Sequence, residues 1–290
     1  MSVKEIGLAL GGGGARGICH IAFLEALDEM GIEVSMISGT SIGSLIGALY
    51  ASGLSGVDIR EMLNNIRFKD IVEMVDLKLF GSTSLFKGQG VKDFLQKNMP
   101  VHTFEKLKIP LKIVATDFWA QKQVILENGD LVSAIMASIC IPAVFEPVLR
   151  DQHVLVDGGI ANNVPFDILK EHSRTIVAID VAGSVVVPED TKKPHMVENL
   201  MLSFEILQKA LLDEKLKYSC PDIHVKPSLN DIGILDFQKT KEILASVEDD
   251  VIRFKKNLEI LVGENEKGRA LWHRLKGIFG IRSSGGSSVL

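Results

Sequence analysis

Cysteine is scarce in this sequence of 290 residues, and its three cysteines lie far apart. Cys19, Cys140 and Cys220 form no CxxC pair and are odd in number, which argues against both a metal centre and a disulfide framework. Free cysteine is among the residue types most often buried. We therefore expect buried thiols in a reducing compartment.

The sequence also lacks long hydrophobic runs and a surplus of basic charge. No stretch approaches the roughly 18 apolar residues of a membrane-spanning helix, and glycines break the first apolar run after a few residues, unlike a secretory signal. The formal net charge is −5, and Lys and Arg are dispersed except near the C-terminus, so nucleic acid is not an expected partner. These features predict a cytoplasmic protein, with peripheral contact at the inner face of a membrane as an option.

The first fifty residues of the sequence alternate between strand patterns and helix patterns. Residues 6–10 and 34–38 are short apolar runs typical of buried strands, while residues 15–30 and 42–51 have apolar residues at helical spacing. This succession favours right-handed crossover connections and a parallel sheet. We therefore predict an α/β fold, and the length allows one large domain or two small ones.

A glycine-rich loop follows the first predicted strand. Residues Gly12 to Gly17 match GxGxxG, a pattern that can hold either a nucleotide phosphate or a developing oxyanion. A dinucleotide site also needs an acidic residue at the end of the second strand. That strand ends in Ile37-Ser38-Gly39, and the nearest acid, Glu33, comes before it. The oxyanion interpretation is therefore favoured.

The second predicted strand leads into Gly39-Thr40-Ser41-Ile42-Gly43, the one GxSxG pattern in the sequence. In such a nucleophile elbow the serine occupies a sharp strand-to-helix turn that exposes its hydroxyl. Adjacent parallel strands place their following turns at the same edge of a sheet, so the N–H groups of the glycine loop can face Ser41. Glycines leave room for an oxyanion there, because they have no Cβ.

A serine nucleophile needs a base, and Asp157 is a candidate. It ends another predicted strand and is followed by Gly158 and Gly159, which keep its carboxylate accessible. The competing explanation is an ordinary turn, where Asp-Gly is common. None of the seven histidines has a comparable position. The sequence leaves open a Ser, Asp, His order whose last member is His172, His195 or His224.

Three motifs in this order, GGGGARG, GTSIG and DGG, resemble those of the patatin-like phospholipase family, as does the segment 134–145. The resemblance covers roughly residues 6–180 and implies a three-layer α/β/α fold with a mainly parallel central sheet. It also implies a serine acyl hydrolase that cleaves phospholipid or lysophospholipid esters by a Ser–Asp dyad, without histidine or a cofactor. In this sequence Ser41 would be the nucleophile and Asp157 the base, and the oxyanion loop would comprise Gly12, Gly13, Gly14, Ala15, Arg16 and Gly17.

Other functions remain possible at this point. A Ser–His–Asp esterase or thioesterase and a non-catalytic lipid-binding regulator on the same fold are both compatible with the motifs. A nucleotide-binding oxidoreductase would leave GTSIG and DGG unexplained. Arg16 is a further open question, because a cation in the first turn of a helix opposes the helix dipole. Either an internal acidic partner or an anionic lipid head group would offset it.

The rest of the chain gives weaker expectations, among them an amphipathic helix over residues 241–261. We expect an acyl hydrolase domain over residues 1–262, followed over 263–290 by an amphipathic segment and a disordered tail. In residues 269–279, apolar and basic side chains fall on different helical faces, which suits either docking on the protein or a membrane interface. Residues 77–90 suit either a cap over an apolar cleft or a surface excursion. The sequence does not indicate an oligomeric state.

Overall fold

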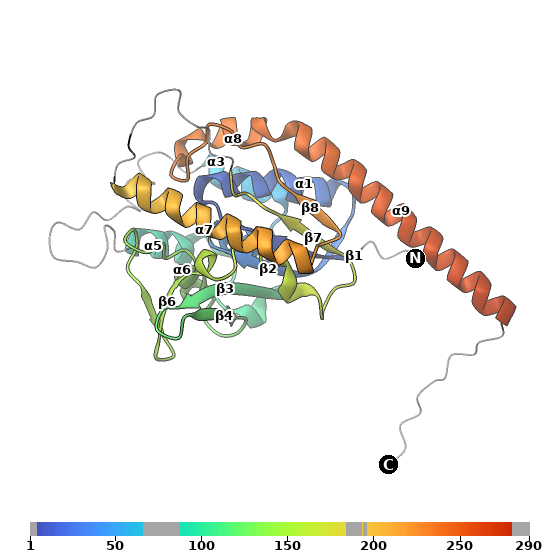
Figure 1. Ribbon diagram of the computed structural model, residues 1–290, viewed down its shortest axis with the longest axis horizontal. Helices are drawn as coiled ribbons and strands as arrows, with labels where there is room; N and C mark the ends of the chain where they lie inside the picture. The colour runs from blue at the N-terminus through green and yellow to red at the C-terminus, as the bar shows by residue number, and fades with distance from the viewer. Residues whose placement is uncertain (1–4, 66–87, 184–192, 194–195, 280–290) are drawn as a thin grey trace, which may run out of the picture.

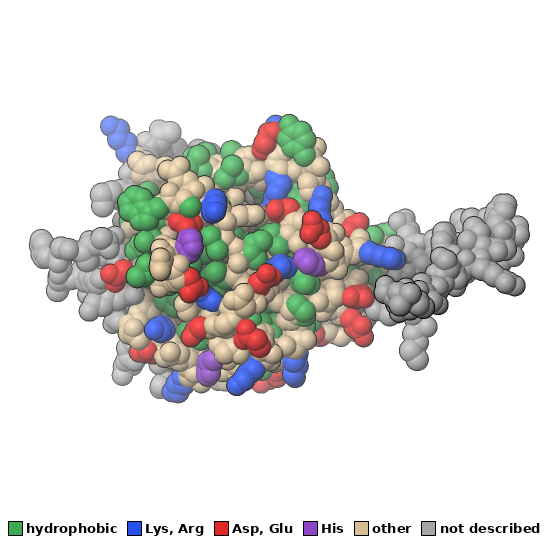
Figure 2. All heavy atoms as spheres, turned by 90° about the horizontal axis from the view of Figure 1, so that it is seen from below, with side chains coloured by type: hydrophobic (Ala, Val, Ile, Leu, Met, Phe, Trp, Pro, Cys, Tyr) green, Lys and Arg blue, Asp and Glu red, His purple; other side chains and the backbone are tan. Residues whose placement is uncertain are grey.

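The computed structural model describes residues 5–65, 88–183, 193 and 196–279, without the side chains of 196, 197 and 264–279. Within these ranges one mixed eight-stranded sheet lies between helices (Figure 1). The cap or excursion predicted over 77–90 lies almost entirely outside the described residues. Seen from below, basic side chains are interspersed with acidic and hydrophobic ones, so this face has no large basic patch (Figure 2).

The sheet is mainly parallel, as predicted. Its strands follow the order β5-β6-β3-β2-β1-β7-β8, and β4 pairs with β3. The run β3-β2-β1-β7-β8 is parallel, whereas β4 and β6 are antiparallel to β3, and β5 is antiparallel to β6. The strands are β1 (Glu5–Leu10), β2 (Glu33–Thr40), β3 (Leu111–Asp117), β4 (Lys122–Leu126), β5 (Val148–Arg150), β6 (His153–Asp157), β7 (Ile176–Ile179) and β8 (Ile223–Val225).

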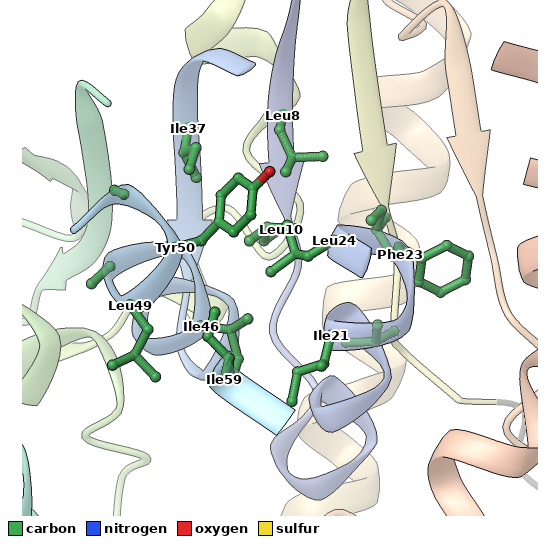
Figure 3. Packing of buried hydrophobic residues seen from close by; sticks show 14 of the residues in the cluster. Leu8, Leu10, Ile21, Phe23, Leu24, Ile37, Ile46, Leu49, Tyr50 and Ile59 are labelled. Carbon is green, nitrogen blue, oxygen red and sulfur yellow. The ribbon is translucent and has the colours of Figure 1, made fainter. Parts of the chain in front are cut away.

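Successive residues of β1 point to opposite faces of the sheet, and the two faces have different covers. Leu8 and Leu10 belong to the main core, which they share with helices α1 (His20–Glu29), α2 (Ile42–Ala51) and α3 (Gly56–Asn64) (Figure 3). Ala9 belongs to a smaller cluster with Phe166, Leu169 and Leu212. These come from the 3-10 helix η4 (Phe166–Leu169) and from α7 (Met196–Tyr218). The predicted three layers are therefore confirmed.

The remaining helices complete the described chain. The α-helices are α5 (Gln89–Asn98), α6 (Leu131–Ser138), α8 (Thr240–Ser246) and α9 (Glu248–Phe279), and the remaining 3-10 helices are η1 (Gly14–Cys19), η2 (Phe104–Lys106), η3 (Gly158–Ile160) and η5 (Phe237–Lys239).

One edge of β3 bonds two strands in succession. Its first half pairs with β2, up to Thr40 opposite Val114, and its second half pairs with β6, from Asp157 opposite Ala115. Both partners lie opposite β4, because residues 113–117 of β3 also pair with β4. Since β2 is parallel and β6 antiparallel to β3, the two strands run toward each other and end at adjacent positions. This arrangement brings Asp157 to the residue that follows Thr40.

Two predicted helices differ in detail from the sequence expectation. The helix predicted over 15–30 begins as η1 and is α-helical only from His20, a common form of helix start. The helix predicted over 241–261 is divided into α8 and α9, because Val247 between them is non-helical and fully buried in the main core. Helix α9 continues to Phe279 across the boundary predicted at residue 262, and the division into two parts stays a prediction.

Of the three thiols, Cys19 and Cys140 are buried as expected, and burial raises the pKa of both, whereas Cys220 is exposed. None of the helices in the described ranges is both long and apolar enough to cross a membrane. The same ranges hold no group of His, Cys, Asp and Glu side chains fit to bind a metal ion.

The main core predicts the first experiment. Phe23 on α1 meets Phe254 on α9 edge to face, with ring centroids 5.4 Å apart, and both rings are fully buried. Phe254→Ala should lower the free energy of unfolding by about 3–5 kcal/mol, because it leaves a cavity. Ile252→Ala, at a residue on the same helix that is 65% exposed, should change it by less than about 0.5 kcal/mol. Urea denaturation followed by circular dichroism would measure both, and equal effects would contradict the packing of α9 on α1.

Candidate active site

Ser41 lies at the sharp turn between β2 and α2, in a backbone conformation that few non-glycine residues adopt. Its φ is 53° and its ψ is −125°. Its neighbours are close enough to require glycine: a Cβ on Gly43 would lie 2.2 Å from the carbonyl oxygen of Leu10. The N–H and hydroxyl of Ser44 both donate to the carbonyl of Ser41, at 2.9 and 2.6 Å. The predicted nucleophile elbow is therefore present in the backbone geometry.

Ser138, which the sequence analysis missed, stabilises this turn. Its hydroxyl accepts the Ser41 N–H at 2.8 Å and donates to the carbonyl of Val114 on β3 at 2.6 Å. Ser138 is fully buried at the end of the apolar helix α6. A hydroxyl at the end of an otherwise largely apolar helix was the available signal, because a buried polar group must find hydrogen-bond partners.

Asp157 ends β6 beside Ser41 and is almost completely buried. Its Oδ1 accepts the N–H of Gly159 at 2.7 Å, while its Oδ2 has no hydrogen-bond partner of good geometry among the described groups. Burial raises the pKa of this carboxyl from 3.8 to about 6, and the Gly159 N–H and then the Ser41 hydroxyl act in the opposite direction. The result is a carboxylate next to the serine with one oxygen free to accept a proton.

The glycine loop offers N–H donors of two kinds. The N–H of Gly12 donates to the carbonyl of Asn163 at 3.1 Å, and that of Ala15 donates to the carbonyl of Ile234 at 2.7 Å. Within the described chain, the N–H groups of Gly13 and Gly14 have no hydrogen-bond partner, and both residues border the same cavity as Ser41. Gly14 has a φ of 59°, where a side chain would be strained. The loop thus leaves two adjacent donors for an anion.

His20 forms a hydrogen bond with the backbone at the start of the glycine loop. Its Nε2 donates to the carbonyl of Gly11 at 2.8 Å, because a carbonyl can only accept. Burial lowers the pKa of His20 to about 4, so the imidazole is neutral at neutral pH. His20 therefore supports the loop without adding a charge to the site.

Arg16 has an internal acidic partner, one of the two possibilities that the sequence left open. Its guanidinium donates to Glu205 of α7 at 3.0 Å and to the carbonyl of Ile232 at 2.7 Å. Both charged side chains are nearly buried, with 7% and 11% of their area exposed. The cation at the start of η1 is thereby neutralised from the opposite side of the site.

A cavity of about 40 Å³ joins these groups. Of the predicted oxyanion residues, Ala15 and Gly17 do not border it; Gly17 packs against Ile42 instead. The other predicted residues build the turns: Gly39 packs against Gly43, Thr40 donates to the carbonyl of Asn162, and Gly158 packs against Val114. The cavity is lined by Gly12, Gly13, Gly14, Arg16, Ser41, Ile141, Asp157, Asn163, Ala182, Met201, Phe204, Glu205, Gln208 and Ile234.

The fold and this site define a class: three-layer α/β proteins in which a serine stands on a nucleophile elbow at the end of a sheet strand. A family model described as patatin-like phospholipase matches residues 8–170, more than half of the chain. The chain therefore belongs to the patatin-like phospholipase family.

Known proteins agree with this assignment. The chain is 36% identical over 185 residues to patatin-like phospholipase domain-containing protein 6 of Homo sapiens, a match that covers 62% of this chain and 14% of that protein. It is 30% identical over 213 residues to an uncharacterized NTE family protein of Mycobacterium tuberculosis, covering 73% of this chain and 59% of that protein. The chain thus spans only part of the curated relatives it matches.

A solved structure supports the fold alone. The crystal structure of VipD from Legionella pneumophila superposes with a TM-score of 0.53 at 16% sequence identity, covering 89% of this chain and 67% of that one.

The buried carboxyl predicts a cost in stability. The pKa of Asp157 is higher in the folded chain than the ordinary value of 3.8, so the folded state binds the proton more tightly and stability falls as pH rises from about 4 to about 6. Above pH 6 the full difference, about 3 kcal/mol, acts against folding. Asp157→Asn should therefore raise the free energy of unfolding at pH 8 and change it little at pH 4.

Urea denaturation at the two pH values would test this. Asp151→Asn, at a side chain that is 87% exposed, is the control and should show no such pH-dependent difference. If Asp157→Asn and the unmodified protein have the same free energy of unfolding at both pH values, Asp157 is not a buried, ionised carboxylate.

Proposed function

We propose that this protein is a serine acyl hydrolase that cleaves lipid carboxyl esters with a Ser41–Asp157 dyad. The proposal rests on one observation: Ser41, the unpartnered Oδ2 of Asp157 and the free N–H groups of Gly13 and Gly14 all border one small cavity. Nucleophile, base and oxyanion donors are the three groups that ester hydrolysis needs.

The chemistry balances without another residue. Ser41 Oγ attacks the ester carbonyl carbon while its proton passes to Asp157 Oδ2, and the N–H groups of Gly13 and Gly14 hold the resulting oxyanion. Collapse breaks the bond to the alcohol oxygen, which takes the proton from Asp157 and leaves Ser41 acylated. Asp157 then deprotonates a water that attacks the acyl-serine, and the proton returns to Ser41 as the fatty acid leaves.

A carboxylate is a weak base at its ordinary pKa, and burial makes Asp157 a stronger base by raising its pKa. General bases work best when their pKa lies near the operating pH. The pKa of about 6 for Asp157 brings the carboxylate close to that range while it stays ionised at pH 7. This removes the need for an imidazole between the two residues.

Two of the three candidate histidines of a triad are described, and neither borders the cavity. His172 is exposed, and His224 lies 3.8 Å from Asp180. The third, His195, lies outside the described residues. Their positions favour the dyad over a Ser–His–Asp esterase.

The substrate class follows from the family rather than from the cavity. Family membership and the relatives named phospholipases support a lipid ester, either a phospholipid or a lysophospholipid. A cytoplasmic location with peripheral membrane contact remains the matching prediction.

Substitution of the dyad tests the assignment directly. Ser41→Ala should lower the hydrolysis of p-nitrophenyl butyrate by at least about 1,000-fold, and Asp157→Asn by at least about 100-fold, because nucleophile and base are removed. Ala at His172, His195 or His224 should lower it less than about threefold. A histidine variant as inactive as Ser41→Ala would establish a triad instead. A fluorophosphonate probe should label the unmodified protein and not Ser41→Ala; absence of labelling in both would favour the non-catalytic regulator.

The pH dependence tests the base. Because only ionised Asp157 accepts a proton, kcat/KM should fall tenfold per pH unit below about pH 6 and be level above it. Circular dichroism over the same range would confirm that the chain stays folded. An inflection near pH 4 would mean that the base has an ordinary carboxyl pKa and would contradict the buried site.

A further inference from the structure

The cavity at Ser41 is too small for the substrate proposed above. Its volume of about 40 Å³ has room for a few water molecules, whereas ligand pockets usually measure about 300–1,000 Å³. A lipid acyl chain can therefore reach Ser41 only if part of the wall moves.

One face of α7 forms the roof of the cavity. Met201, Phe204, Glu205 and Gln208 all border it and stand at positions i, i+3, i+4 and i+7, which share one side of a helix. Gln208 approaches the turn after Asp157 so closely that a Cβ on Gly159 would lie 2.3 Å from its Nε2. In Figure 1, α7 crosses the face of the sheet on the side opposite α1.

The two halves of α7 are attached very differently. In the second half, Lys215 donates to the side chains of Asn162 and Asp167 and to the carbonyl of Val164, all within 2.7 Å, and lies 4.3 Å from the ring centre of Phe166. Leu212 adds apolar contact there, in the smaller core cluster.

The first half of α7 has weaker attachments. Of its described residues, Met201 alone is buried, and an ion pair between Glu205 and Arg16 joins this half to the glycine loop. Opening a nearly buried ion pair changes the free energy little, because water solvates both charges once they separate. The first half is therefore held to the rest of the chain less firmly than the second half.

The outer side of the same half carries apolar side chains that are in contact with solvent. Ile206 and Leu207 are 65% and 63% exposed, and Leu200 is 39% exposed. The charges further along this outer side pair among themselves, Lys209 with Asp213 and Lys217 with Glu214. An apolar surface with balanced charge suits the interface of a zwitterionic lipid layer.

We infer that residues 198–208 of α7 form a lid over Ser41, and that this lid opens when its outer side, with Leu200, Ile206 and Leu207, docks on a zwitterionic lipid surface. The inference rests on the proposed function, since a lipid surface is where a lipid ester substrate is found. Docking buries the apolar side chains that are exposed in the closed chain, and lifting the lid gives the acyl chain a path to Ser41.

Vesicle binding tests the docking surface. In the Ser41→Ala protein, which leaves lipid intact, the double substitution Ile206→Ser/Leu207→Ser should weaken flotation with phosphatidylcholine vesicles at least tenfold. The matched control is Ile252→Ser/Ile260→Ser on α9, at residues 65% and 51% exposed, which should bind as the parent does. In the catalytic protein, the lid variant should lose hydrolysis of vesicular phosphatidylcholine to the same extent and keep its turnover of monomeric p-nitrophenyl butyrate.

Amide hydrogen exchange tests the opening. Vesicles should speed exchange in residues 198–208 of the Ser41→Ala protein and leave residues 212–218 protected. Three results would each overturn the inference. The Ser41→Ala parent does not bind vesicles, the lid and control variants bind equally well, or amide exchange in residues 198–208 does not change when vesicles are added. A lid variant that turns a dimer into a monomer, without loss of vesicle binding, would show an interface between copies and also overturn it.

The docking test and the proposed function can fail separately. If the unmodified protein does not hydrolyse the monomeric ester, the proposed function fails. Flotation and amide exchange of the Ser41→Ala protein would still test whether residues 198–208 form a lid.

Discussion

The edge of β3 is the constraint on which the site depends. It bonds β2 as far as Val114 and β6 from Ala115 onward, so a parallel and an antiparallel strand run head to head along one line. Neither can continue without colliding with the other, and both chains must turn away at once. Ser41 and Asp157 stand at these two ends. The pairing register of the sheet, rather than a local motif, therefore sets the proximity of the hydroxyl and the carboxylate.

That proximity is maintained against two local costs. Ser41 has a positive φ, and Asp157 is a buried carboxyl whose pKa is raised to about 6. The surrounding structure fixes both, through Ser138 on the serine N–H and Gly159 on the carboxylate. Strained backbone and shifted pKa values of this kind gather at functional sites. Here both costs fall on the two residues of the proposed dyad.

The two sides of the cavity come from different parts of the chain. Ser41, Asp157 and the glycine loop lie within the family model, which ends at residue 170, whereas α7, Ile232 and Ile234 come after it. The ion pair of Arg16 with Glu205 joins the two parts across 189 positions of sequence. The helix that covers the cavity thus comes from the part of the chain that follows the family model. That cover faces the cavity with one side and solvent with the other.

The sequence alone determined the features that depend on neighbouring residues: the strand before each glycine turn, the GxSxG elbow, the Asp-Gly-Gly turn and the parallel βαβ start. Local steric and hydrogen-bonding requirements fix these, so they can be read from short spans. Only the tertiary structure decided that β6 meets β2 head on and that Ser138 supports Ser41. It also decided that the N–H groups of Gly13 and Gly14 have no partner among the described residues, and that α7 borders the cavity. Each of these depends on contacts between residues far apart in the chain, and such contacts form only when the sheet register and the packing of its two faces are settled together.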